Sequence, residues 1–96
     1  MKAAWFEAFG NAKDVIRVGE QTKPQAGPGE VLVRLQTSGV NPSDVKKRAG
    51  AFPNLLKDGP VIPHSDGAGV IEAVGDKVAN SRAGERVRVQ VSISRI

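Results

Sequence analysis

The run from Asp66 to Val74 is the feature that most restricts the fold, because after Asp66 it is small and apolar apart from Glu72. Such a run predicts a strand buried on both faces, with glycines that let a neighbouring backbone approach closely. The turn residues Gly75 and Asp76 end it. The run therefore favours a domain built on strands.

Further short strands are predicted around this run, separated by turn residues such as Gly10-Asn11. The clearest alternates with period two, with Val87 and Val89 on one face and Arg86 and Arg88 on the other. The predicted strands are Lys2 to Phe6, Val15 to Val18, Glu30 to Val40 and Arg86 to Ser94, and the predicted loops are Gln21 to Gly29 and Ala51 to Pro63.

One helix interrupts the strands. Asn41 suits its N-cap and Pro42 its first position. Ser43 to Ala49 then makes about two turns before Gly50 ends the helix. The sequence therefore predicts a mainly β domain with one short helix, arranged as a small barrel closed on itself.

Composition narrows the class of protein. Ninety-six residues suggest one domain. The net charge of +4 comes from dispersed basic residues, and the densest cluster, Lys46-Lys47-Arg48, has no aromatic neighbour, so nucleic-acid binding is not predicted. The absence of cysteine excludes disulfides and thiolate sites. No apolar run approaches membrane-spanning length, so we expect a cytoplasmic protein without a membrane partner.

Five sets of segments, spread over most of the chain, stand in the order found in one enzyme superfamily. They are Met1-Lys-Ala-Ala with Phe9-Gly10, Pro28-Gly-Glu-Val-Leu-Val33, Ser38-Gly-Val-Asn-Pro-Ser-Asp44 with Arg48-Ala-Gly50, Pro63 to Gly75, and Ala83-Gly-Glu-Arg-Val87. On these residues the chain resembles the GroES-like N-terminal domain of the medium-chain dehydrogenase/reductase superfamily. The closest resemblance is to its zinc-free, quinone-oxidoreductase-like branch.

The resemblance also bears on zinc. Zinc-dependent members place a cysteine where Asn41 stands and a His–Glu pair where Ser65 and Asp66 stand. Asparagine and serine are poor zinc ligands. His64, the single histidine, is one residue too early for the ligand position. We therefore predict no catalytic zinc, and we interpret His64 as a solvated or packed loop residue.

The zinc-free members of the superfamily pass a hydride from the nicotinamide of NADPH to a quinone or an activated double bond. The protein orients the two reactants and excludes water. The resemblance implies that Asn41 faces the nicotinamide–substrate cleft and donates a side-chain hydrogen bond, and that Ser65 faces the same cleft. Asn41 and Ser65 are thus the candidate catalytic residues, and Asn41 is also the candidate cofactor contact.

Asp44, Lys46 and Arg48 follow the family's helix pattern and are the candidate lining residues of that cleft. Structural alternatives stay open: Asn41 suits a helix cap, Asp44 a first-turn dipole partner and Arg48 a last-turn charge. Many quinone oxidoreductases carry a tyrosine at the position of Lys46, and this chain has no tyrosine. Lys46 then either donates a hydrogen bond or lies on a solvated helix face.

We interpret residues 1–96 as one GroES-like domain, with the dinucleotide-binding domain absent. That second domain needs a glycine-rich turn between a strand and a helix. Gly67-Ala-Gly69 is followed by a strand instead, and it lacks a third glycine at the required spacing. NADP(H) is therefore expected in the full-length family but is not expected to bind this chain alone.

Two further interpretations concern the chain as a whole. The chain is an excised domain, a truncated gene product or a natural single domain. If it is a natural single domain, the alternative function is that of a free-standing GroES-like module that binds a partner or oligomerises without catalysis. Arg86 to Ser94 presents an apolar face and an open strand edge, which invites pairing with another copy. We predict a homodimer through this C-terminal strand.

Overall fold

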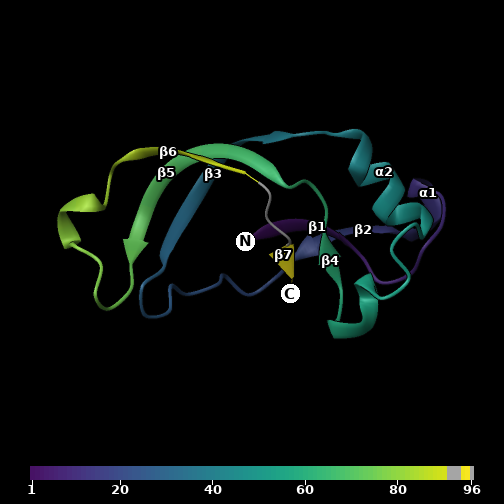
Figure 1. The fold of residues 1–96 in the computed structure, drawn as a ribbon, viewed down its shortest axis with the longest axis horizontal. Helices are drawn as coiled ribbons and strands as arrows, with labels where there is room; N and C mark the ends of the chain where they lie inside the picture. The colour runs from purple at the N-terminus through teal and green to yellow at the C-terminus, as the bar shows by residue number, and fades with distance from the viewer. Residues whose placement is uncertain (91–93, 96) are drawn as a thin grey trace.

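The structure, a computed structural model, describes residues 1–90 and 94–95. Its strands form two antiparallel sheets (Figure 1). No ladder joins the two sheets within the described residues, and the predicted mainly β class is confirmed. The first sheet has the order β2-β1-β4-β7, with β1 Lys2–Phe6, β2 Ile16–Glu20, β4 Val61–Ile62 and β7 Ser94–Arg95; the second has the order β3-β5-β6, with β3 Val31–Gly39, β5 Asp66–Val74 and β6 Arg86–Val89.

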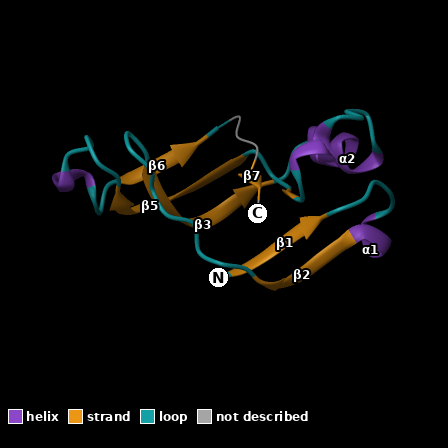
Figure 2. Cartoon of the chain, turned by 90° about the horizontal axis from the view of Figure 1, so that it is seen from below, coloured by secondary structure: helices purple, strands orange, loops and turns teal. Residues whose placement is uncertain are grey.

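The helices gather mostly at one end. Figure 2 shows α1 and α2 together at the end of the molecule opposite the turn between β5 and β6. The helices are α1 (Ala12–Val15), α2 (Pro42–Ala49) and the 3-10 helices η1 (Leu55–Asp58) and η2 (Asn80–Arg82). The sequence predicted α2 and missed the other three.

The boundaries of α2 follow its capping residues. Asn41 is the N-cap in an extended conformation, and Pro42 occupies the first helical position. Gly50 ends the helix with φ 99°, a left-handed conformation that costs glycine little. These ends match the sequence-based prediction.

Strands β3 and β5 pack closely, as the glycines predicted. A Cβ built on Gly69 would lie 2.0 Å from the backbone oxygen of Arg34, so only glycine fits there. This also confirms Gly67 to Gly69 as a strand segment. The prediction that the whole strand is buried on both faces is wrong, because Glu72 and Ala73 are exposed.

Several predicted boundaries shift. The return strand begins at Ile16, because Val15 ends α1. The predicted loop from Ala51 to Pro63 contains η1 and β4. Burial does not alternate along β3, since Val31 to Val33 are all half-buried and Arg34 to Ser38 are all exposed. Its register against β5 shifts between Leu32 and Val33 and between Leu35 and Thr37. The alternation of the last strand holds from Arg86 to Val89, and part of the remaining prediction, residues 91–93, lies outside the described residues.

The core is small. Phe6, Leu55 and Val61 are buried together between β1, η1 and β4, and Ile71 is buried separately in β5. The radius of gyration is 14.4 Å, above the roughly 12.5 Å expected for a compact chain of this length. None of the helices within the described residues is long and apolar enough to cross a membrane.

The loop before β3 is tied to the end of β5. Gly75 N–H donates to the Glu30 carbonyl at 2.8 Å, and the Lys23 ammonium donates to Glu72 at 2.8 Å. That hydrogen bond lowers the pKa of the Glu72 carboxyl. A carboxyl with a lowered pKa stabilises the fold at neutral pH, and this contribution is lost as the pH falls through the folded-state pKa.

Replacing Gly69 with alanine tests the close packing of β3 on β5. The new Cβ would collide with the Arg34 carbonyl, so the strands must separate, and we expect a loss of about 2 kcal/mol or more in the free energy of unfolding. The control is Gly19→Ala, whose Cβ meets only the Trp5 side chain at 3.3 Å and should cost less than about 1 kcal/mol. Urea unfolding measures both, and equal losses would contradict the assignment.

Candidate functional site

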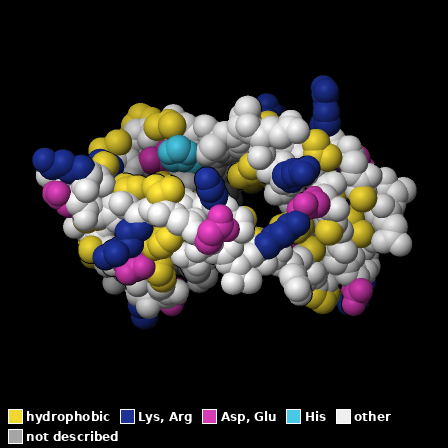
Figure 3. Space-filling view, turned by 180° about the vertical axis from the view of Figure 1, so that it is seen from behind, with side chains coloured by type: hydrophobic (Ala, Val, Ile, Leu, Met, Phe, Trp, Pro, Cys, Tyr) yellow, Lys and Arg dark blue, Asp and Glu magenta, His cyan; other side chains and the backbone are white. Residues whose placement is uncertain are grey.

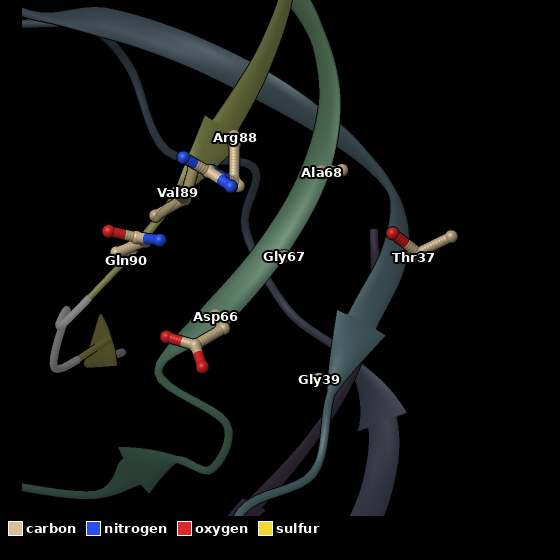
Figure 4. Close-up of a pocket in the computed structure, with 8 residues that line it drawn as sticks. All are labelled: Thr37, Gly39, Asp66, Gly67, Ala68, Arg88, Val89 and Gln90. Carbon is tan, nitrogen blue, oxygen red and sulfur yellow. The ribbon is translucent and has the colours of Figure 1, made fainter.

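Two pockets lie near the start of β5, one lined by Pro63 and His64 and the other by Asp66 and Gly67. One, of about 310 Å³, opens between the start of α2 and strands β1 and β2; its lining is Ala4, Phe6, Ile16, Val40, Asp44, Val45, Arg48, Pro63 and His64. We call it the α2 pocket. The other, of about 270 Å³, lies at the end of the second sheet; its lining is Thr37, Gly39, Asp66, Gly67, Ala68, Arg88, Val89 and Gln90. Figure 4 shows β5 running between the β6 side and the β3 side of this second pocket.

Asp44 joins α2 to the segment before β5. Its side chain is only 7% exposed. Oδ2 accepts a hydrogen bond from Asn41 N–H at 2.8 Å, and Oδ1 accepts one from His64 N–H at 3.0 Å. Both carboxylate oxygens are therefore used by the backbone. Asp44 lines the α2 pocket, and its contacts go well beyond the dipole partner considered from the sequence.

Asn41 occupies the N-cap of α2 and forms a capping box with Asp44. Its side chain also reaches the second sheet, because Nδ2 donates to Asp66 Oδ2 at 2.7 Å. Asp66 lines the pocket at the end of that sheet. The Asn41 side chain is thus a hydrogen-bond donor, and its acceptor in this structure is Asp66.

Ser65 meets a lysine that the sequence did not single out. Lys47 Nζ donates to Ser65 Oγ at 2.8 Å, and the pair is partly buried. Lys46, the predicted lining residue, is exposed and lines neither pocket. Helix geometry explains the difference: Lys47 lies three residues after Asp44 and shares its face, whereas a spacing of two turns Lys46 away. Applying that periodicity would have found Lys47.

Arg48 lies four residues after Asp44 and also faces the α2 pocket. Its Nε donates to the Gly10 carbonyl at 3.2 Å, and Gly10 N–H donates to the Arg48 carbonyl at 2.9 Å. Of the five residues predicted for the site, Asp44 and Arg48 come together in one pocket. Asn41 and Ser65 do not line this pocket, but each makes a side-chain hydrogen bond at the start of β5. Lys46 is exposed and lines neither pocket.

The sequence analysis interpreted His64 as a solvated or packed loop residue, and the structure places it half-buried in the segment between β4 and β5. Its φ is 77°, although it is not a glycine. Ser38 Oγ lies 2.6 Å from its Nδ1, and the side chain lines the α2 pocket. Neither composition nor spacing signals a left-handed histidine. Its conformation is explained by its contacts in the folded chain, which are the hydrogen bonds to Asp44 and Ser38 at the edge of the α2 pocket.

The described residues hold no cluster of three or more His, Cys, Asp or Glu side chains able to bind a metal ion. The charged groups around the α2 pocket are engaged within the protein: the Asp44 carboxylate by two backbone N–H groups and Arg48 Nε by a carbonyl. The arrangement can orient a small molecule and donate hydrogen bonds to it.

Comparison with known proteins shows which family the chain belongs to. The alcohol dehydrogenase GroES-like domain model matches residues 27–95. An alcohol dehydrogenase of Geobacillus stearothermophilus is 42% identical over 89 residues, which cover 93% of this chain and 25% of that protein. A quinone oxidoreductase of Mus musculus is 34% identical over 97 residues, covering 98% and 28%. The chain thus spans about a quarter of the length of these relatives.

Solved structures give the same picture. A putative NADPH:quinone reductase from Bacillus thuringiensis superposes with a TM-score of 0.82 and 36% identity, covering 91% of this chain and 26% of that one. A cobalt- and zinc-bound alcohol dehydrogenase from Pyrobaculum aerophilum gives a TM-score of 0.76 and 38% identity, covering 92% and 26%. Relatives with and without zinc in their descriptions therefore share this fold.

Asp44→Asn tests the junction between α2 and β5. The amide would turn an NH₂ group toward one of two backbone N–H donors, so we expect a loss of about 1–3 kcal/mol in the free energy of unfolding. Asp58→Asn, in the exposed part of η1, is the matched control and should stay within about 0.5 kcal/mol of wild type. Equal urea midpoints for the two variants would show that the junction contributes nothing.

Proposed function

Because the chain belongs to the alcohol dehydrogenase GroES-like domain family, we propose that it is the substrate-side domain of an NADPH-dependent, zinc-independent quinone or alkene oxidoreductase. The observation that carries the proposal is the pair of hydrogen bonds Asn41–Asp66 and Lys47–Ser65 at the start of β5. Similarity to quinone oxidoreductases over most of the chain supports the substrate class. The reaction itself belongs to the full-length protein.

Zinc independence is supported by the donor set. The Asn41 amide donates its hydrogen to the Asp66 carboxylate, and the Lys47 ammonium lies 2.8 Å from Ser65 Oγ. A cationic lysine at that distance opposes a divalent cation there, and neither an amide nor a hydroxyl replaces the thiolate and imidazole that zinc prefers. These residues do not fit a catalytic zinc ion.

When bound in the full-length protein, NADPH supplies the hydride for the substrate. The chain's own residues then orient the substrate and stabilise charge. Asp44 fixes the start of α2 against the residues before β5, which holds Asn41 and Ser65 in place. Lys47 brings a positive charge to the start of β5, where its field favours the negative charge that develops on the substrate during reduction.

Cofactor binding by the isolated chain is not part of the proposal. Gly67 to Gly69 belongs to β5, where Gly69 packs against the Arg34 backbone and cannot cradle a phosphate. Micromolar binding of NADPH to the 96-residue chain in a fluorescence titration would contradict this interpretation.

We also propose a cytoplasmic location and no nucleic-acid role, because cysteine is absent and basic residues are dispersed.

A chimera tests the proposed reaction. This chain replaces the equivalent domain of the Bacillus thuringiensis protein, and NADPH oxidation is followed with duroquinone. We expect turnover that 1,10-phenanthroline leaves unchanged. Lys47→Met should lower kcat/KM by about 10-fold, because a positive charge that favours the developing negative charge on the substrate is lost. Lys57→Met, in exposed η1, is the control and should stay within about twofold.

A folded chimera that is inert to quinones, or that oxidises alcohols only with added zinc, would contradict the proposed function. Equal losses in the two lysine variants would remove Lys47 from the mechanism while leaving the substrate class untouched.

The alternative of a self-associating module rests on β6, which is the last strand of its sheet among the described residues and leaves Val89 half-buried. If two copies pair there, Val89→Lys should shift the mass measured by light scattering from dimer to monomer, because a charge would enter the interface. Val18→Lys, on β2 at the edge of the other sheet, is the control and should keep the dimer. A wild-type monomer at every concentration contradicts the alternative.

A further inference from the structure

His64 is held in a backbone conformation that histidine rarely adopts. Its φ of 77° lies in the left-handed region. Two hydrogen bonds hold the residue in place: its N–H donates to Asp44 Oδ1 at 3.0 Å, and its Nδ1 lies 2.6 Å from Ser38 Oγ. Strained residues of this kind cluster at ligand sites, where the surrounding structure over-determines them. The imidazole is therefore a candidate ligand contact.

The α2 pocket around His64 suits a neutral ligand. The two formally charged residues of its lining, Asp44 and Arg48, cancel each other and already make hydrogen bonds within the protein. The other lining residues are apolar: Ala4, Phe6, Ile16, Val40, Val45 and Pro63. Figure 3 shows the histidine at the surface with hydrophobic side chains beside it, so a ligand can reach it from solvent. Such a lining favours a small apolar molecule with one polar group to anchor.

The hydrogen bond with Ser38 occupies Nδ1 of His64, so Nε2 is the ring nitrogen that can contact a ligand. A hydroxyl both donates and accepts, so it can serve either form of Nδ1. When Ser38 donates to Nδ1, the neutral ring carries its hydrogen on Nε2; when the ring is charged, Nε2 also carries a hydrogen. No hydrogen bond to Nε2 occurs within residues 1–90 and 94–95. A ligand with only an acceptor, such as a carbonyl oxygen, selects these donor forms.

We propose that His64 Nε2 donates a hydrogen bond to the carbonyl oxygen of a neutral, apolar enone or quinone bound in the α2 pocket. Ser38 holds Nδ1 and can accept the tautomer in which Nε2 is the donor, and Asp44 holds the backbone that presents the ring. The inference rests on the proposed function for its substrate class and assigns the residue that anchors the substrate. His64 is a positioning residue in this scheme, and it exchanges no proton with the substrate.

The test compares an enone with its hydrocarbon. Isophorone and 1,5,5-trimethylcyclohexene differ mainly in the carbonyl, and each is titrated into the ¹⁵N-labelled 96-residue chain with NMR detection. We expect isophorone to shift the Nε2 resonance and the amides of Val40, Val45 and His64, and to bind about 3- to 10-fold more tightly than the hydrocarbon. His64→Gly suits the positive φ and should abolish this preference with little effect on hydrocarbon binding.

Ser38→Ala keeps the ring and removes its partner, so the preference should fall about two- to threefold. Thr37→Val removes a hydroxyl from the preceding position of β3, which lines the other pocket, and should leave it unchanged. Equal binding of the two ligands by wild type, an unchanged preference in His64→Gly, or shifts confined to the pocket of Thr37 would each overturn the proposal. Since this titration needs no cofactor, its failure is separate from failure of the chimera to reduce quinones.

Discussion

The hydrogen bonds of Asp44 are the constraint on which the site depends. One carboxylate accepts from Asn41 N–H at the start of α2 and from His64 N–H, twenty residues further along the chain. A buried acceptor with two fixed donors leaves little freedom to either segment. The helix is thereby anchored to the residues that lead into β5. These two segments carry Asn41, Lys47, His64 and Ser65, whereas Ser38 lies on β3.

A second pair of hydrogen bonds acts alongside the first. Asn41 reaches Asp66, and Lys47 reaches Ser65, so α2 and the start of β5 are joined at the level of side chains as well. The position of β5 is fixed in turn by its close packing on β3, where Gly69 meets the Arg34 carbonyl. Backbone packing in the second sheet therefore sets where the polar groups of the site lie.

The sequence predicted what depends on local pattern. Apolar runs bounded by turn residues, and the Asn41-Pro42 helix start, gave β1, β3, β5 and α2 close to their observed limits. The two-residue strand β4 is too short to carry a period, so it was missed. The site was predicted less well: Lys46 was chosen where helix phase selects Lys47, and nothing local signals that Asp44 holds His64 in a left-handed conformation.

The small core gives these polar contacts unusual weight. Few apolar side chains are fully buried in the described part of the chain, with Phe6 and Val61 at its centre. A strained His64 lowers stability, and in a domain with so little burial its hydrogen bonds to Asp44 and Ser38 offset the strain. Because both oxygens of the Asp44 carboxylate already accept backbone hydrogen bonds, a ligand is not required to satisfy them. Recognition in the α2 pocket then falls to the imidazole, whose Nε2 has no partner within the described residues.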